Sequence, residues 1–192
     1  MAPTSPVVLI LGHSFVRNDL ETGFDQRADV NFNLEGTATV FMHGVGGRTV
    51  PKLRKFDLHV VKRLSPDIII LEIGTNDLTR NGPEIVGSEI DDFVRFILDN
   101  LPVHVVGVCH VIPCVFSCVN SQISFLTRAT ALKQYTSDVL GDLTSVFCWL
   151  HSPFSSPDKE FYLDDGVHLH SVGQYQLYRS YRGAILRAIP ML

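Results

Sequence analysis

Four short segments of the sequence carry side chains that together could perform acyl transfer. A serine follows a glycine and a histidine at Ser14, glycines cluster in GVGG (residues 44–47), a carboxamide lies in GTND (residues 74–77), and a carboxylate and an imidazole lie in DGVH (residues 165–168). Acyl transfer needs a nucleophile, a base that a carboxylate holds in one tautomer, and donors for a developing oxyanion. These residue types therefore predict a serine nucleophile that is served by a histidine base.

The carboxylate and the imidazole are close in sequence. Asp165 and His168 can meet only if the chain turns between them, and Gly166 eases that turn because glycine adopts conformations that other residues avoid. Asp164 is the second choice for the carboxylate. Asn76 suits an oxyanion site because a carboxamide donates hydrogen bonds without a charge that titrates.

Each segment also has a purely structural interpretation. Ser14 could cap a following helix, although the Glu or Gln of a capping box is absent three residues later. The glycines of 44–47 could form a simple turn. Asp77 is expected to cap the helix that follows it. The case for chemistry therefore rests on the four segments occurring together.

Nearly continuous apolar runs alternate with helical patterns along the chain. Such runs suit strands that are buried on both faces of a parallel sheet, and the alternation puts helices on both faces. We predict a three-layer α/β/α sandwich of the flavodoxin-like type, with five parallel strands in the order 2-1-3-4-5 and one domain over residues 1–192 with a flexible tail at 1–6. The expected strands are 7–11, 39–42, 67–73, 103–109 and 145–150, and the expected helices are 49–64, 83–100, 121–141 and 171–189.

Ligands in open sheets of this kind bind beyond the carboxyl ends of the strands. The first three segments follow the first three expected strands, and the fourth precedes the last expected helix. The fold therefore predicts that the four segments meet at one edge of the sheet.

In this order the segments resemble the sequence blocks of the SGNH (GDSL-type) hydrolase superfamily, and the resemblance spans nearly the whole chain. The motifs GHSFV, GVGGRTV and IGTNDL are most similar to those of the esterase domains in the first open-reading-frame proteins of animal non-LTR retrotransposons. The sequence is also similar to platelet-activating-factor acetylhydrolases. The resemblance implies that Ser14 is the nucleophile, His168 the general base and Asp165 the residue that orients it. It also implies an oxyanion hole built from the backbone N–H groups of Ser14 and Gly47 and from the Asn76 side chain.

Two residues depart from the usual pattern of that family. His13 stands where the first block usually has Asp, and Arg48 stands where a common form of the second block has Asp. Hydrogen bonding around the nucleophile must therefore differ, and the two changes could be linked if the residues usual in the family share a network. They leave the type of mechanism unchanged and the substrate preference open.

The resemblance implies hydrolysis of short acyl esters, acetyl esters among them, with a link to lipids or membrane surfaces. The apolar stretch 110–126 leads us to expect that Val115 and Phe116 line the acyl pocket or meet a lipid surface, although a core contact or a helix start explains it equally well. A second hypothesis is a non-catalytic module that binds lipid, carbohydrate or protein through the same cleft. The complete set of Ser, Gly, Asn, Asp and His favours the esterase.

Composition and charge narrow the class of partner. The 192 residues are 45% hydrophobic and 19% charged, which is typical of a globular protein, and a net charge of −4 gives no bulk attraction for nucleic acid. No apolar run is long enough for a signal peptide or a membrane span, so we expect a soluble, intracellular protein that is monomeric as an isolated domain. Asp165, His168 and His170 could hold a metal ion, with His13 as a further ligand. Because no zinc spacing, nucleotide loop or cofactor motif is present, we expect no metal and no cofactor.

Overall fold

The chain folds around one parallel sheet, which has the predicted order β2-β1-β3-β4-β5 in the part of the chain that the structure describes. The structure is a computed structural model that describes residues 5–16, 29–114, 122–155 and 158–192. Val115 and Phe116, which we expected near the acyl group, lie outside the described residues, as do residues 1–4 of the expected tail. The strands are β1 (Val7–Gly12), β2 (Thr39–Gly44), β3 (Ile68–Glu72), β4 (Val105–Cys109) and β5 (Val146–Trp149).

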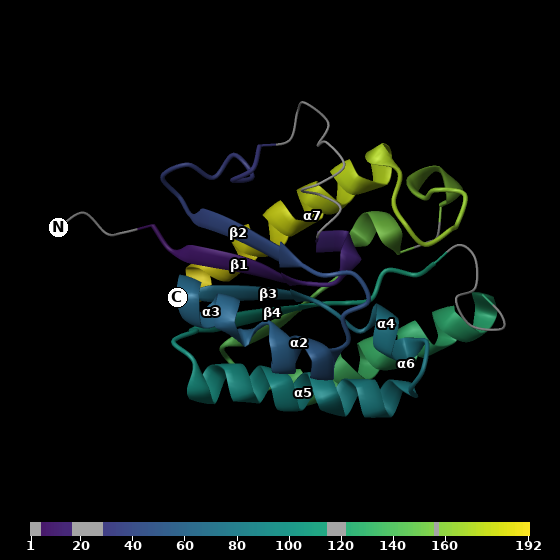
Figure 1. Cartoon of the computed structure of the whole chain (residues 1–192), viewed down its shortest axis with the longest axis horizontal. Helices are drawn as coiled ribbons and strands as arrows, with labels where there is room; N and C mark the ends of the chain where they lie inside the picture. Colours follow the sequence, from purple (N-terminus) through teal and green to yellow (C-terminus); the bar gives the residue numbers. More distant parts are fainter. Residues whose placement is uncertain (1–4, 17–28, 115–121, 156–157) are drawn as a thin grey trace.

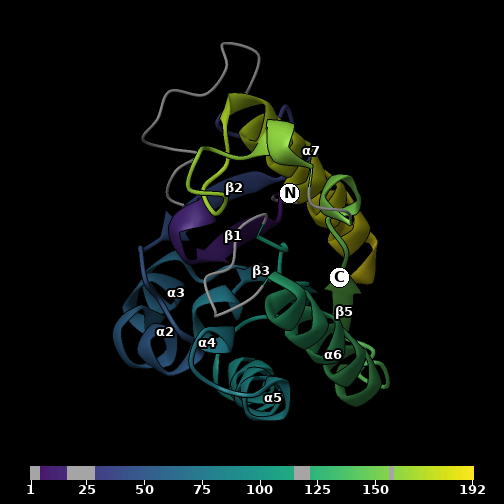
Figure 2. The same cartoon turned by 90° about the vertical axis from the view of Figure 1, so that its right-hand side faces the viewer.

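Helices cover both faces of the sheet and make the three predicted layers (Figures 1 and 2). Helices α2, α3, α5 and α6 pack on one face, whereas α7 packs on the other. No described helix is both long and apolar enough to cross a bilayer. The helices are α2 (Val50–Phe56), α3 (Leu58–Leu64), α4 (Thr75–Leu78), α5 (Pro83–Asn100), α6 (Gln122–Leu140) and α7 (Ser171–Ala188), and three short 3-10 turns are η1 (Ser152–Phe154), η2 (Lys159–Phe161) and η3 (Ile189–Met191).

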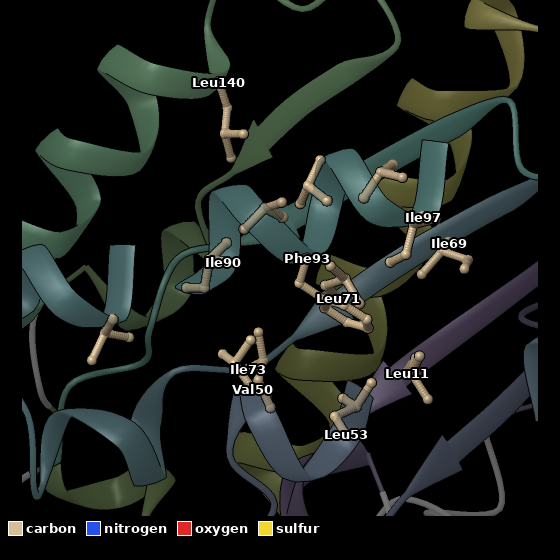
Figure 3. Close-up of a cluster of buried hydrophobic side chains, with 14 of the residues drawn as sticks. Leu11, Val50, Leu53, Ile69, Leu71, Ile73, Ile90, Phe93, Ile97 and Leu140 are labelled. Atoms are coloured by element: carbon tan, nitrogen blue, oxygen red, sulfur yellow. The ribbon is translucent and has the colours of Figure 1, made fainter. Parts of the chain in front are cut away.

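The period-two alternation of the strands divides the apolar core into two clusters. In β1, Leu9 and Leu11 belong to the cluster under α2, α3, α5 and α6, whereas Val8 and Ile10 belong to the cluster under α7. Figure 3 shows the first cluster, in which Leu71 of β3 lies beneath the α5 side chains. With apolar side chains on both faces, the central strands are rigidly held and their carboxyl ends are fixed in space.

Two details of the predicted elements were wrong. β2 is an edge strand whose residues are exposed or half-buried, rather than a strand buried on both faces. The single helix expected over 49–64 is two helices, α2 and α3, which meet at Asp57. The apolar spacing concealed the break because Leu53 of α2 and Val60 of α3 pack into the same cluster.

The last residue of β1 is a glycine, Gly12, because β1 lies very close to β3 at this point. A side chain at this position would overlap the carbonyl oxygen of Glu72. The ladder continues for one more bond, in which the His13 N–H donates to the same carbonyl at 3.2 Å. The glycine therefore lets the first strand run tightly against its neighbour up to the residue before Ser14.

Candidate active site

Ser14 is the first residue of a helical turn that begins directly after β1. Residues 14–16 are helical, and the Val16 N–H donates to the His13 carbonyl at 3.2 Å. The residue in the capping position is His13, whose Nδ1 accepts a hydrogen bond from the Phe15 N–H at 3.4 Å. Ser14 is therefore the first helical residue rather than the cap that its sequence position could suggest, and its side chain is half-buried.

The glycine segment is tied to the end of β1. The Val45 N–H donates to the Gly12 carbonyl at 3.1 Å, and the Arg48 N–H closes a turn onto the Val45 carbonyl at 3.2 Å. Gly47 occupies the third position of that turn with a φ of 70°, a left-handed conformation that favours glycine. The backbone of Gly47 is exposed at the same edge as Ser14.

The third segment is joined to the second by side-chain hydrogen bonds. The Asn76 Nδ2 donates to the Arg48 carbonyl at 2.8 Å. A carboxamide nitrogen has two N–H groups, and within the described residues the second N–H of Asn76 has no acceptor. It is therefore available to a bound oxyanion.

The sequence suggested that Asp77 caps the helix that follows it, but the structure shows a different contact. Asp77 lies inside α4, and its Oδ1 accepts from the Val50 N–H at 2.9 Å, so it caps the start of α2 instead. Burial raises the pKa of Asp77 to about 6. Asp77 thus joins the third segment to the helix that follows the second. Burial of its carboxylate is unfavourable, and the hydrogen bond from Val50 offsets part of that free energy.

The fourth segment forms the carboxylate–imidazole pair that the spacing predicted. The His168 Nδ1 lies 2.6 Å from the Asp165 Oδ2, while the Asp165 Oδ1 accepts from the backbone N–H groups of Val167 and His168 at 2.9 and 2.8 Å. Gly166 makes the turn with a φ of 65°. Although burial acts to raise the pKa of Asp165, the hydrogen bonds from His168 and the two backbone groups lower it.

Hydrogen bonds join the first three segments. The fourth segment interacts with the first through the charge of His168. His168 is close enough to His13 to lower the pKa of that imidazole. Within the described ranges, no hydrogen bond joins the Ser14 Oγ to the His168 ring.

A buried polar network beneath this edge was missed by the sequence analysis. Glu72, at the end of β3, is fully buried, and its Oε2 lies 2.8 Å from the His151 Nε2 and 3.2 Å from the Tyr181 hydroxyl. The His151 Nδ1 lies 2.8 Å from the Ser180 Oγ. Burial acts to raise the pKa of Glu72, but His151, His13 and Tyr181 outweigh it and lower that pKa. The signal in the sequence was one acidic residue, Glu72, within the otherwise apolar run IIILEI (residues 68–73).

The same network holds the one group of metal-ligating residue types whose ligand atoms cluster in the described part of the chain. The atoms of Glu72, Cys109 and His151 all lie within 4.8 Å of one another. Hydrogen bonds already join Glu72 to its neighbours, and burial raises the pKa of the Cys109 thiol well above its usual value, so the thiol keeps its proton. The set fits a hydrogen-bonded cluster better than a metal site. The alternative metal site around His168 and His170 does not form such a group.

The two departures from the family pattern lie in separate networks. Arg48 forms a two-pronged ion pair with the buried Asp57, at 2.6 and 3.1 Å, and His43 lies 3.1 Å from the same carboxylate. His13 instead faces Glu72. Among the residues described, no direct hydrogen bond or ion pair connects the two networks.

An apolar cavity opens beyond the carboxyl ends of β4 and β5. Its volume is about 140 Å³, and its largely apolar lining includes the polar residues His110, Thr130, Lys133, His151 and Ser155. Burial lowers the pKa of His110 to about 4, so this imidazole is neutral at ordinary pH. The Tyr162 hydroxyl donates to the Pro113 carbonyl at 2.5 Å, which ties the wall of the cavity to the loop that carries His168.

Comparisons with known proteins identify the family of the chain and proteins of similar fold. A model of the GDSL-like lipase/acylhydrolase family matches residues 10–175. The fold is similar to that of a Bacteroides fragilis protein classed as a candidate acylhydrolase (TM-score 0.76, 18% identity, 97% of this chain and 91% of that chain). It is also similar to an acetyl xylan esterase (TM-score 0.70, 15% identity, 93% and 99%) and to an acetyl esterase determined with acetate (TM-score 0.69, 16% identity, 96% and 98%).

At these identities the solved structures support the fold alone, and no curated protein sequence matches the chain. The family model, in contrast, covers most of the sequence, including all four segments. The chain belongs to the GDSL-like lipase/acylhydrolase family, that is, to the SGNH hydrolase superfamily.

Proposed function

We propose that the protein is a serine esterase that hydrolyses short-chain carboxylic esters. The observation that carries the proposal is the Asp165–His168 hydrogen bond in a chain of this hydrolase family, with Ser14 at the start of the helical turn that follows β1. The carboxylate holds the Nδ1 side of the imidazole, which leaves the Nε2 side to act as a base.

In the proposed mechanism, the Ser14 Oγ attacks the ester carbonyl carbon while the His168 Nε2 takes the hydroxyl proton. The tetrahedral intermediate then expels the alcohol, which receives that proton from His168, and an acyl-enzyme remains. Water attacks the acyl group with the same imidazole as base, and the carboxylic acid leaves as Ser14 regains its proton. Asp165 stays ionised throughout and stabilises the imidazolium.

The proposed oxyanion hole uses the N–H groups of Ser14 and Gly47 and the second N–H of Asn76. The bond from Asn76 to the Arg48 carbonyl supports this role because it fixes the amide plane before substrate arrives. Loss of one such donor typically costs about 2.7–4 kcal/mol of transition-state stabilisation.

For the substrate we propose an acetyl-type ester, and a lipid is one candidate for the molecule that carries it. Two proteins of similar fold are an acetyl xylan esterase and an acetyl esterase. We also propose that the retrotransposon esterase domains and the platelet-activating-factor acetylhydrolases are the relevant relatives within the family. The same proposal includes a single catalytic domain and an intracellular location.

The test is hydrolysis of p-nitrophenyl acetate by the purified protein and by Ser14→Ala, each with and without EDTA. Ser171→Ala is a matched control, since Ser171 is an exposed serine at the start of α7 near His168. We expect turnover that is lost in Ser14→Ala, kept in Ser171→Ala and unaffected by EDTA. Equal background rates in all three proteins would favour the non-catalytic binding module, and sensitivity to EDTA would favour a metal-dependent hydrolase.

A further inference from the structure

The residue before the nucleophile is a buried histidine whose two ring nitrogens face different groups. The side chain of His13 is 2% exposed. Its Nδ1 accepts the Phe15 N–H, and its Nε2 lies 3.8 Å from the Glu72 Oε1. Neither the Nε2 nor that Oε1 has a hydrogen-bond partner within the described residues, so the two atoms face each other across a short gap.

This arrangement selects one tautomer of His13. An Nδ1 that accepts a hydrogen bond carries no proton, and a neutral imidazole then carries its proton on Nε2. Burial lowers the pKa of His13, an effect that Glu72 partly offsets and that His151 and His168 reinforce. The neutral ring therefore directs its single N–H towards the buried carboxylate, which holds the ring in this tautomer.

Glu72 is positioned to impose this choice because its other oxygen is already occupied. Its Oε2 accepts from His151 and from Tyr181, which come from the end of β5 and from α7. The carboxylate is thus fixed by elements that are far from it in sequence. Its Oε1, which has no hydrogen-bond partner among the described residues, faces His13, and the Cys109 thiol also lies against the carboxylate.

We propose that Glu72 is a positioning residue for the nucleophile. It sets the tautomer and orientation of His13, whose Nδ1 then caps the turn that presents the Ser14 hydroxyl and the Ser14 N–H to the substrate. The inference rests on the proposed esterase function for its effect on rate. The capping itself is a property of the fold.

Glu72→Gln tests the mechanism because an amide has one acceptor atom and one donor atom. His151 and Tyr181 donate to the amide oxygen, so the NH₂ group faces the His13 Nε2. An Nε2 that accepts a hydrogen bond carries no proton, so the proton of the neutral ring moves to Nδ1. That proton breaks the cap on Phe15. His13→Asn is the matched second variant. The asparagine oxygen is always an acceptor, so it can cap the same N–H without help from Glu72.

The first measurement is kinetic, on p-nitrophenyl acetate. We expect Glu72→Gln to lower kcat about 5- to 20-fold with little change in KM, and to lower it less than about 2-fold in the His13→Asn background. An equal loss in both backgrounds means that Glu72 only supports folding, and it would overturn the proposal. Urea unfolding of each variant checks that the folded fraction stays the same.

The second measurement is independent of activity and of any variant. Two-bond ¹H–¹⁵N correlation spectra of the wild-type protein report which ring nitrogen of each histidine carries the proton. We expect His13 to be protonated on Nε2 only. A proton on Nδ1, or signals that change when EDTA removes a metal ion from the Glu72 cluster, would overturn the inference even if the protein is an active esterase, and the predicted spectrum could be observed even if it is not.

Discussion

Two carboxylate–histidine pairs lie at the same edge of this molecule and differ in exposure. The side chains of His168 and Asp165 are 42% and 48% exposed, whereas those of His151 and Glu72 are 1% and 0% exposed. The atoms are nearly as close in one pair as in the other, at 2.6 and 2.8 Å. Residue types and distances alone therefore do not distinguish them.

The difference in exposure assigns different tasks to the two pairs. An exposed imidazole can exchange a proton with a substrate, and an exposed ion pair contributes at most about 1 kcal/mol to stability. The buried pair is almost completely shielded from solvent, and removal of one partner leaves an unpaired polar group in the interior. The exposed pair should therefore control rate, and the buried pair should control stability and the shape of the nucleophile turn.

The largest expected effect is on the exposed pair. His168→Ala should lower kcat/KM for p-nitrophenyl acetate by at least about 10³-fold, because the general base is lost. The free energy of unfolding should change by less than about 0.5 kcal/mol, since the side chain is exposed. Esterase kinetics and urea unfolding on the same preparation check both parts. A large loss of stability with normal activity would reverse the assignment of the two pairs.

The neighbouring aspartates give a matched test of the carboxylate. Asp165→Asn should lower kcat by about 10²- to 10⁴-fold, because the amide presents an N–H to the His168 Nδ1 and favours the wrong tautomer. Asp164→Asn should leave kcat within about 2-fold, since the bond to His168 comes from Asp165. The stronger effect at Asp164 would make that residue the orienting acid.

The buried pair should show the opposite behaviour. Glu72→Ala should lower the free energy of unfolding by about 3–5 kcal/mol, because His151, Tyr181 and His13 lose their common partner. Asp165→Ala, the exposed counterpart, should cost less than about 1 kcal/mol. Urea denaturation followed by circular dichroism measures both. Similar costs for the two variants would contradict the comparison.

The smallest expected effect is a dependence of stability on pH. Because the folded-state pKa of His13 is lowered, the unfolded chain takes up the proton first as pH falls through about 6.5, and the native state loses up to about 1.4 kcal/mol per pH unit below that. Asp77 has the opposite sign, since its raised pKa favours folding as pH falls towards 4. The difference between wild type and His13→Asn isolates the histidine. That difference should shift against the wild type between pH 7.5 and pH 5.5, and a constant difference would mean that His13 is not held neutral.

The sequence predicted the exposed pair and not the buried one for a physical reason. Asp165 and His168 are three residues apart around a glycine, so local chain geometry alone brings them together. Glu72 meets His151 and Tyr181 across 79 and 109 residues, and only the completed packing of β3, β5 and α7 defines these contacts. The order of the strands was predictable because the apolar runs and helical patterns alternate regularly. The break at Asp57 was not, because Leu53 before it and Val60 after it pack into the same cluster and keep the helical spacing.

The most direct test of the central claim is covalent labelling of the nucleophile. The protein is treated with an ethyl fluorophosphonate probe, and the adduct is quantified by intact mass and located by peptide mapping. The account predicts one adduct per chain on Ser14, no adduct in Ser14→Ala and labelling at least about 10²-fold slower in His168→Ala. An adduct on a different residue, or equal labelling rates in the wild type and His168→Ala, would contradict the assignment of Ser14 as a nucleophile that His168 activates.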